Sequence, residues 1–213
     1  MDFAIRRHTR YDGYMQWYEA EVQALQRACA GRVNGTRHPV FYGSSSIRMW
    51  VTLAEDIDPS VVNLGFGGST LEACDYFFDR LVPPVKPASL LLYAGDNDLG
   101  DGRSPEQVLA SFRSLARKRD AALGGVPFGF ISIKPSPARF GIIDRIRKTN
   151  DLVRAEVEAT AGGYYVDIYS SMLDEAGQPR PEFYSPDGLH LNREGYRLWA
   201  GIVNTHRHQF LTQ

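Results

Sequence analysis

The sequence predicts a three-layer α/β/α fold, in which a five-stranded parallel sheet of order 2-1-3-4-5 lies between two layers of helices. Five short apolar segments alternate with helical patterns, and right-handed crossovers then leave few other topologies. Polar loops follow these segments, where ligands bind in sheets of this kind. A length of 213 residues suits one domain with a substantial core. We therefore expect a single domain over residues 1–213.

An amphipathic helix is expected near the N-terminus, where apolar positions recur every three or four residues. They are Tyr14, Tyr18, Val22, Leu25 and Cys29. Turn residues at 32–38 end this pattern. Residues 1–35 should therefore form a helical extension that packs on the domain.

The five predicted strands are apolar runs bounded by turn residues, and helical patterns separate them. The strands cover residues 39–43, 61–66, 89–95, 127–133 and 163–169. The helices that follow them cover residues 45–57, 71–81, 140–160 and 192–211, and one more begins after Ser104. At this last helix, Ser104 supplies a hydroxyl cap and Pro105 occupies the first helical position, which is a typical helix start.

Composition and charge favour a globular protein with no strong electrostatic partner. Hydrophobic residues make up 43% and charged residues 23% of the chain, and the net charge of −1 draws neither nucleic acid nor an anionic membrane. No apolar run approaches the roughly 20 residues of a membrane span. We expect a soluble cytoplasmic protein without stable membrane insertion. The basic run 113–119 is interpreted as a solvated helix face.

The two cysteines, Cys29 and Cys74, are too few for a disulfide framework. Both lie in amphipathic patterns, where cysteine often acts as a small buried apolar residue. A reducing compartment is therefore favoured over a disulfide-dependent fold.

Polar residues with catalytic potential follow each predicted strand. Because the carboxyl ends of parallel strands meet at one edge of the sheet, these loops should converge. They are the serines at 44–46, "GFGGST" at 65–70, "GDNDLGDG" at 95–102, "KPSPAR" at 134–139 and "SPDGLHLN" at 185–192. Together they hold the parts of an acyl-transfer site.

Acyl transfer needs a nucleophile, a base, a residue that orients the base and donors for the oxyanion. Ser45 is the candidate nucleophile and His190 the candidate base. Asp187 lies three residues before His190 and can hold its tautomer. The glycine loop and Asn97 offer N–H donors, and the helix that starts near Ser45 adds its own. Taken alone, Ser45 is also compatible with a helix cap and Asn97 with a turn residue.

Other kinds of site are disfavoured by the sequence. Gly65-x-Gly67 begins a dinucleotide-binding pattern, but Thr70 occupies its third glycine position and no acidic residue follows where the ribose requires one. There is no Walker loop, no His-Glu-x-x-His and no paired Cys-x-x-Cys. We therefore expect no cofactor and no metal ion.

Four of these loops resemble the four sequence blocks of the SGNH hydrolases, also called the GDSL esterase/lipase family. "FYGSSSI" resembles the first block, with Ser45 at the nucleophile position, and "NLGFGGST" resembles the second, with Gly68 at the oxyanion glycine. "GDND" resembles the third block, with Asn97 as the oxyanion asparagine. "DGLHLN" resembles the block that supplies Asp187 and His190. The blocks occur in family order over residues from about 40 to 200.

One position departs from the family pattern. The first block usually reads Gly-Asp-Ser, whereas this chain has Ser44 in place of the aspartate. A serine can still cap the following helix, so the turn should survive. "GSSSIRMW" is similar to a branch related to platelet-activating-factor acetylhydrolase subunits and to many bacterial GDSL-type esterases.

The resemblance implies a flavodoxin-like SGNH hydrolase fold and an esterase that works through an acyl-enzyme without a cofactor. The expected substrate is a small-molecule carboxylic ester with a short acyl chain. The same machinery would also serve a carbohydrate acetylesterase, a lysophospholipase or a thioesterase. A non-catalytic flavodoxin-like module that binds a ligand at the same strand ends is a more distant alternative.

Several side chains near the predicted site have two interpretations. Five apolar or aromatic side chains either line an acyl pocket or pack in ordinary loops: Leu99, Phe140, Phe183, Tyr184 and Leu189. Lys134 and Arg139 either meet an anionic leaving group or pair with nearby acids.

Overall fold

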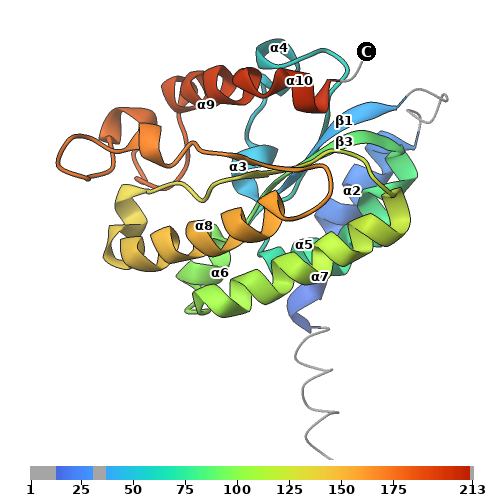
Figure 1. Cartoon of the computed structure of the whole chain (residues 1–213), viewed down its shortest axis with the longest axis horizontal. Helices are drawn as coiled ribbons and strands as arrows, with labels where there is room; N and C mark the ends of the chain where they lie inside the picture. Colours follow the sequence, from blue (N-terminus) through green and yellow to red (C-terminus); the bar gives the residue numbers. More distant parts are fainter. Residues whose placement is uncertain (1–12, 31–36, 212–213) are drawn as a thin grey trace, which may run out of the picture.

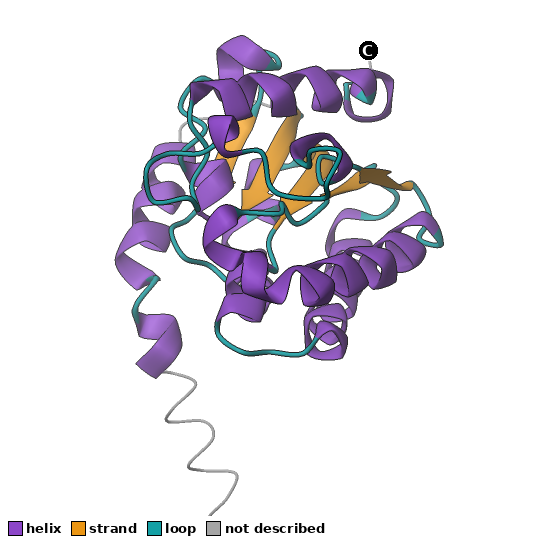
Figure 2. Cartoon of the chain, turned by 90° about the vertical axis from the view of Figure 1, so that its left-hand side faces the viewer, coloured by secondary structure: helices purple, strands orange, loops and turns teal. Residues whose placement is uncertain are grey.

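A sheet of five parallel strands runs through the centre of the molecule, with helices on both of its faces (Figure 1, Figure 2). The computed structural model describes residues 13–30 and 37–211. The strand order is β2-β1-β3-β4-β5, and the predicted order is thereby confirmed. The strands are β1 (His38–Gly43), β2 (Val62–Gly65), β3 (Pro87–Tyr93), β4 (Phe128–Ile131) and β5 (Gly163–Val166).

The helices form a layer on each face of this sheet. The layer below the sheet in Figure 1 consists of α2 (Glu19–Cys29), α5 (Leu71–Leu81), α7 (Pro105–Leu123) and α8 (Ile143–Glu158). The layer above it consists of α3 (Ser45–Arg48), α4 (Leu53–Asp56), α9 (Arg193–Thr205) and α10 (Arg207–Phe210). A short helix, α6 (Asp96–Gly100), follows β3. Four 3₁₀ turns complete the described elements: η1 (Pro83–Val85), η2 (Pro137–Ile142), η3 (Ser170–Met172) and η4 (Pro181–Phe183).

Each layer closes its own apolar core against the sheet. Alternate residues of a strand point to opposite faces, so Val40 and Tyr42 of β1 enter the core below the sheet, whereas Phe41 enters the core above it. All three side chains are fully buried. We call these the lower core and the upper core. Burial on both faces explains why the strands read as continuous apolar runs.

The two helices with clear sequence signals begin where the sequence predicts. The helix α5 covers the predicted residues, and α7 starts at Pro105. At α7, Ser104 accepts a hydrogen bond from the Gln107 N–H while the Gln107 side chain accepts one from the Ser104 N–H. This capping box satisfies donors that the first helical turn would otherwise leave unpaired.

Several predictions about helices differ from the structure. The predicted helix 192–211 is divided into α9 and α10 at His206. Residues 45–57 form α3 and α4 with a turn between them, instead of one helix. In that turn the Trp50 indole and the Thr52 hydroxyl both donate to the Asp56 carboxylate, and such local bonds compete with a continuous helix. The "GDND" segment, expected as a loop, instead begins α6.

The basic run 113–119 is also not a uniform solvated face, because Arg119 is fully buried. Its guanidinium carbon lies 4.8 Å from the centre of the Phe128 ring, and it donates to the backbone carbonyls of Gly124, Val126 and Ala161. Arg119 therefore joins backbone segments of two loops, and its guanidinium is not exposed to solvent.

The described part of the N-terminal segment packs against the lower core. Tyr18 and Val22 are buried there, and Arg80 of α5 makes two hydrogen bonds of 2.8 Å to the Glu19 carboxylate. Residues 1–12 and 31–35 of the predicted extension lie outside the described residues. No helix in the described part of the chain is long and apolar enough to cross a bilayer.

Candidate active site

The ends of β1, β2 and β3 are joined by backbone hydrogen bonds, and this brings three candidate loops to one edge of the sheet. The Ser44 N–H donates to the Tyr93 carbonyl, and the Phe66 N–H donates to the Gly43 carbonyl, each at 2.9 Å. Gly43 has a φ of +140°, and a Cβ atom there would lie 1.9 Å from the Tyr93 carbonyl oxygen. Glycine at 43 therefore allows the strands to meet this closely.

The three serines after β1 have different environments. Ser44 occupies the N-cap position of α3, but its side chain is buried and makes no capping hydrogen bond. Ser46 is also buried, and its carbonyl accepts a hydrogen bond of 3.0 Å from the Tyr196 hydroxyl. Ser45, the first residue of α3, is partly exposed. Within residues 13–30 and 37–211, neither its hydroxyl nor its N–H group makes a hydrogen bond.

The loop before α9 pairs His190 with Asp187. The His190 Nδ1 atom lies 2.6 Å from Asp187 Oδ2, and the His190 side chain is 27% exposed. The other carboxylate oxygen accepts the N–H groups of Leu189 and His190. These bonds, with the one to the imidazole as the strongest cause, lower the pKa of Asp187 to about 2. Asp187 is therefore ionised at neutral pH and can hold a proton on Nδ1.

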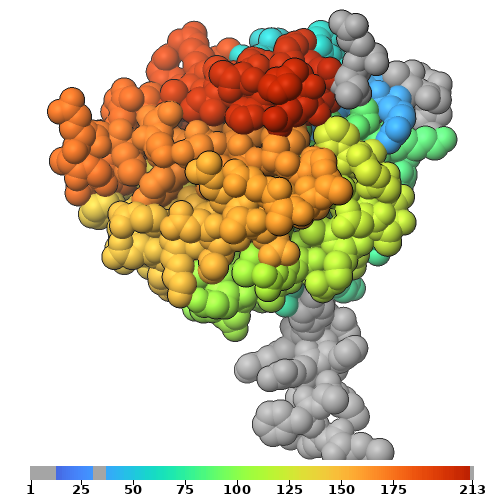
Figure 3. Space-filling view, in the orientation of Figure 1, coloured from blue at the N-terminus to red at the C-terminus, as the bar shows by residue number. Residues whose placement is uncertain are grey.

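Further backbone hydrogen bonds hold this loop in place. The Ser185 N–H donates to the His190 carbonyl at 2.8 Å, and the Ala138 N–H of η2 donates to the Gly188 carbonyl at 3.0 Å. At the start of α9, the Asn192 side chain donates to the carbonyls of Glu182 and Tyr184. Figure 3 shows that, at the surface, the yellow segment containing η2 borders the orange segment that follows β5.

The glycine loop after β2 is held by the N-terminal helix. The Gly67 N–H donates to the Glu21 carboxylate at 2.8 Å, and the Tyr18 hydroxyl donates to the Gly68 carbonyl at 3.1 Å. Glu21 also forms an ion pair with Arg48 of α3. In the described part of the chain, the Gly68 N–H has no acceptor. It is therefore available as a donor.

Asn97 lies in the first turn of α6, and its amide is held on two sides. Its Nδ2 atom donates to the Ser69 carbonyl at 3.0 Å, and its Oδ1 atom accepts a hydrogen bond of 3.0 Å from Arg139. A primary amide has two N–H bonds, so one donor of Asn97 remains. Ser45, Gly68 and Asn97 thus each keep one unused N–H donor near the ends of three adjacent strands.

Comparison with known proteins identifies the family. A family model for the GDSL-like lipase/acylhydrolase family matches residues 30–198, which is more than half of the chain. The chain belongs to this family. It is therefore an esterase or acylhydrolase, as the sequence predicts. No curated protein matches the chain significantly.

Solved structures support the fold of this acylhydrolase. A GDSL-like lipase from Bacteroides thetaiotaomicron is 23% identical with a TM-score of 0.74, covering 92% of this chain and 98% of that one. The lipase/acylhydrolase from Enterococcus faecalis is 20% identical with a TM-score of 0.66, covering 84% and 99%. A protein from Streptococcus pneumonia, provisionally described as a platelet activating factor, is 19% identical with a TM-score of 0.77, covering 94% and 99%.

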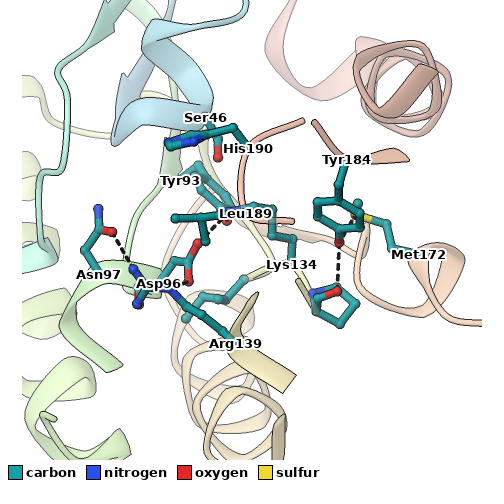
Figure 4. Close-up of polar contacts among 12 residues, drawn as sticks. Ser46, Tyr93, Asp96, Asn97, Lys134, Arg139, Met172, Tyr184, Leu189 and His190 are labelled. Carbon is teal, nitrogen blue, oxygen red and sulfur yellow. Dashed lines mark hydrogen bonds and ion pairs between the residues drawn. The ribbon is translucent and has the colours of Figure 1, made fainter. Parts of the chain in front are cut away.

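Lys134 and Arg139 of the acylhydrolase pair with an acid, which decides between their two interpretations. The buried Lys134 ammonium lies 2.5 Å from Asp96 Oδ2 and 3.1 Å from the Tyr93 hydroxyl. Arg139 Nε lies 3.2 Å from Asp96 Oδ1. Figure 4 shows these residues together with Asn97 and His190.

The five candidate pocket residues separate into two groups. Leu99, Phe183 and Tyr184 are buried in the two cores, and the Tyr184 hydroxyl donates to the Pro135 carbonyl at 2.8 Å. Phe140 and Leu189 are partly exposed. Of the five, only these last two can present apolar surface to a substrate of the acylhydrolase.

Asp98, next to Asn97, is a buried acid that the sequence prediction did not single out. Its carboxylate is fully buried and accepts the Leu71 N–H at 2.8 Å, which joins α6 to the start of α5. Burial raises the pKa of Asp98 to about 6. Tyr18, Glu21 and the role of Arg139 beside Asn97 were missed as well. The contacts of Tyr18, Glu21 and Arg139 join residues that are 42 to 50 positions apart in sequence, so no local pattern indicates them.

One expected contact is not formed. In the described part of the chain, no hydrogen bond joins the Ser45 hydroxyl to the His190 ring. Such bonds often shorten only when a substrate binds, so this geometry is compatible with a nucleophile and its base. No group of three or more His, Cys, Asp or Glu side chains among the described residues is arranged to hold a metal ion.

Proposed function

We propose that this acylhydrolase cleaves carboxylic esters with short acyl chains through an acyl-enzyme intermediate on Ser45. The observation that carries the proposal is the 2.6 Å contact between His190 Nδ1 and Asp187 Oδ2. This contact keeps the proton on Nδ1, so that the Nε2 atom of His190 is free to accept a proton. An imidazole prepared in this way is the base that a serine nucleophile needs.

In the first half of the reaction, the Ser45 oxygen attacks the ester carbonyl carbon while His190 takes the hydroxyl proton. Asp187, whose pKa is lowered to about 2, stays ionised and stabilises the imidazolium. The tetrahedral intermediate then collapses, and His190 protonates the leaving alcohol. In the second half, His190 activates a water molecule, which releases the acid and restores Ser45.

Three N–H donors hold the negative charge that develops on the carbonyl oxygen. They are the backbone N–H groups of Ser45 and Gly68 and the remaining amide N–H of Asn97. Support comes from their lack of other acceptors in the described part of the chain. Donors fixed before the reaction starts are the main source of stabilisation in such sites.

The preference for short acyl chains is supported by the burial of three candidate pocket residues. Leu99, Phe183 and Tyr184 belong to the cores, so little apolar surface is left near the site for a long chain. The partly exposed Phe140 and Leu189 suffice for contact with a small acyl group.

The test combines covalent labelling with a panel of esters. Ser45→Ala should abolish labelling by a fluorophosphonate probe and ester hydrolysis, with folding checked by circular dichroism. Ser44→Ala is the matched control, and we expect it to keep much of both. The panel should vary acyl length and include an acetylated sugar, a lysophospholipid and a thioester.

Two outcomes would contradict the proposal. If Ser44→Ala is the inactive variant, the nucleophile is one residue earlier than proposed. If long acyl chains are hydrolysed faster than acetyl or butyryl esters, the short-chain preference is wrong.

A further inference from the structure

Arg139, a residue of η2, contacts the Asn97 amide (Figure 4). Its Nη2 atom donates to Asn97 Oδ1 at 3.0 Å. Its Nη1 atom donates to the Asp96 backbone carbonyl, and its Nε atom lies 3.2 Å from Asp96 Oδ1. The guanidinium thus contacts two consecutive residues of the first turn of α6.

These contacts determine which way the Asn97 amide points. A guanidinium has only donors, so the amide oxygen must face it, and a flipped amide would set NH₂ against NH₂. The Ser69 carbonyl takes one of the two amide N–H bonds. The amide therefore presents a single remaining N–H, in a direction fixed by Arg139 and Ser69 together.

The charge balance around Asp96 adds a second effect. Lys134 and Arg139 share the one carboxylate of Asp96. The cluster of these three side chains therefore has a net positive charge. The guanidinium that donates to Asn97 Oδ1 polarises the amide and makes its N–H groups stronger donors.

We propose that Arg139 is a positioning residue that orients and polarises the Asn97 amide as an oxyanion donor. The inference rests on the proposed function, because it assigns to Arg139 a role in the same oxyanion hole. Arg139 acts through Asn97 and does not itself touch the substrate oxygen.

The Arg139 guanidinium can occupy its position only because residue 100, the last residue of α6, is a glycine. A Cβ atom on Gly100 would lie 1.6 Å from Arg139 Nη1 and 2.4 Å from its Cζ atom. Gly100 has no positive φ, so alanine fits its backbone. Gly100→Ala would therefore displace the end of the Arg139 side chain while leaving the arginine in the protein.

A matched control lies two residues after Arg139. Gly141 is exposed and also lacks a positive φ, and a Cβ atom at this position would have no neighbouring atom of the described residues within 4 Å. Gly141→Ala makes the same chemical change in η2 without disturbing the guanidinium.

The experiment measures kcat and KM for hydrolysis of a short-chain nitrophenyl ester. Arg139→Met should lower kcat by about 10-fold to 100-fold with little change in KM, somewhat less than the loss of a whole oxyanion donor. Gly100→Ala should act in the same direction, and Gly141→Ala should match the wild type. Circular dichroism and thermal melting check that each variant is folded.

A double-mutant cycle with Asn97→Ala decides whether Arg139 acts through the amide. We expect Arg139→Met to lower kcat by less than about threefold in the Asn97→Ala background. If Arg139→Met costs the same factor with and without Asn97, or if folded Gly100→Ala retains wild-type kcat, the inference is wrong. Failure of the proposed function would appear differently, as activity that survives in Ser45→Ala.

Discussion

Asp98 is a buried carboxylate with one hydrogen bond from the Leu71 N–H, and its other oxygen has no partner among the described residues. Burial is the largest cause that raises its pKa to about 6, and the nearby acids Asp101 and Asp96 act in the same direction. The residue next to Asn97, the proposed oxyanion donor, therefore changes charge close to neutral pH. Ionisation of Asp98 requires desolvation of its charge in the folded protein but not in the unfolded chain. It therefore lowers the free energy of unfolding.

The sign of the resulting pH dependence follows from the two pKa values. The folded protein holds the Asp98 proton up to about pH 6, whereas the unfolded chain releases it near the ordinary value of 3.8. Between these values the native state binds more protons, so this group favours folding less as pH rises. Asp98→Asn keeps an acceptor for the Leu71 N–H but cannot ionise. The free energy of unfolding of this variant, relative to that of wild type, should increase by about 2–3 kcal/mol between pH 4 and pH 7.

Urea unfolding of both proteins at the two pH values provides the measurement. Other titrating groups are common to both proteins and cancel in the difference. A stability difference between wild type and Asp98→Asn that is the same at pH 4 and pH 7 would show that folding does not raise the pKa of Asp98.

At the level of elements, α2 contributes to the site without supplying a reacting group. Glu21 of this helix and Tyr18 at its N-cap hold the N–H of Gly67 and the carbonyl of Gly68. The Phe66–Gly67 and Gly68–Ser69 peptide groups are thereby restrained, and the peptide that carries the Gly68 N–H lies between them. A helix far from the other site residues in sequence thus sets the direction of one proposed oxyanion donor.

Tyr18→Phe tests this contribution. The ring would keep its edge contacts with Phe66 and Phe77, at centroid distances of 5.5 and 6.2 Å, while its hydrogen bond to Gly68 is lost. We expect kcat to fall by about 3-fold to 10-fold with little change in KM, because a donor is loosened but not removed. Steady-state hydrolysis is the measurement. The control is Trp17→Phe, since Trp17 is 80% exposed. Equal activity of Tyr18→Phe and this control would contradict the role.

Elements with strong local signals are predictable from the sequence, and elements held by tertiary contacts are not. The sequence of helix α7 contains the Ser104 cap, Pro105 at the first helical position and apolar residues at helical spacing. Helices α3, α4 and α6 have four or five residues each and are too short to be stable alone. Distant contacts hold them, such as those of Lys134 and Arg139 with Asp96. The burial of Arg119 could not be predicted either, because the carbonyls that accept its hydrogen bonds lie in loops that come close to it only in the folded protein.

The site follows the same rule. That Ser45, Gly68 and Asn97 lie at one edge of the sheet could be predicted, because each follows a strand of a parallel sheet. The Asp187–His190 contact could be predicted from a spacing of three residues. The unused N–H of Gly68 could not, because it depends on Tyr18 and Glu21, which are nearly 50 residues away. The single-domain prediction for residues 1–213 stays a prediction.

At the scale of the whole molecule, an ion pair joins the start of α9 to α4. Arg193 at the start of α9 makes hydrogen bonds of 2.6 and 2.8 Å to the two oxygens of Asp56 in α4. The same carboxylate accepts from Trp50 and Thr52. The bond from Arg193 is the largest cause that lowers the pKa of Asp56 to about 2.

Asp56→Asn should therefore destabilise the protein at neutral pH. The folded pKa lies below the unfolded value of 3.8, so the stabilisation is complete above that value and is lost as pH falls through about 2. The Asp56 side chain is 9% exposed and that of Arg193 is 44% exposed, so we expect about 1–2 kcal/mol after allowance for screening. Urea unfolding at pH 7 measures it. Glu194→Gln, which breaks an exposed pair with Arg197, is the control and should change stability by less than about 0.5 kcal/mol. Equal effects of both variants would contradict the prediction.

The two cores on opposite faces of the sheet divide the proposed chemistry between them. Ser45 begins a helix of the upper core, and His190 directly precedes Leu191 of the same core. Gly68 and Asn97 each lie two positions in sequence from a residue of the lower core, Phe66 and Leu99 respectively. In the proposed mechanism, bond making thus belongs to the upper half of the molecule. Two of the three oxyanion donors, Gly68 and Asn97, lie on the lower side of the sheet, and the third is the N–H of Ser45 itself. Substitutions that repack the upper core can therefore change the proposed attack on the substrate while Gly68 and Asn97 keep their positions.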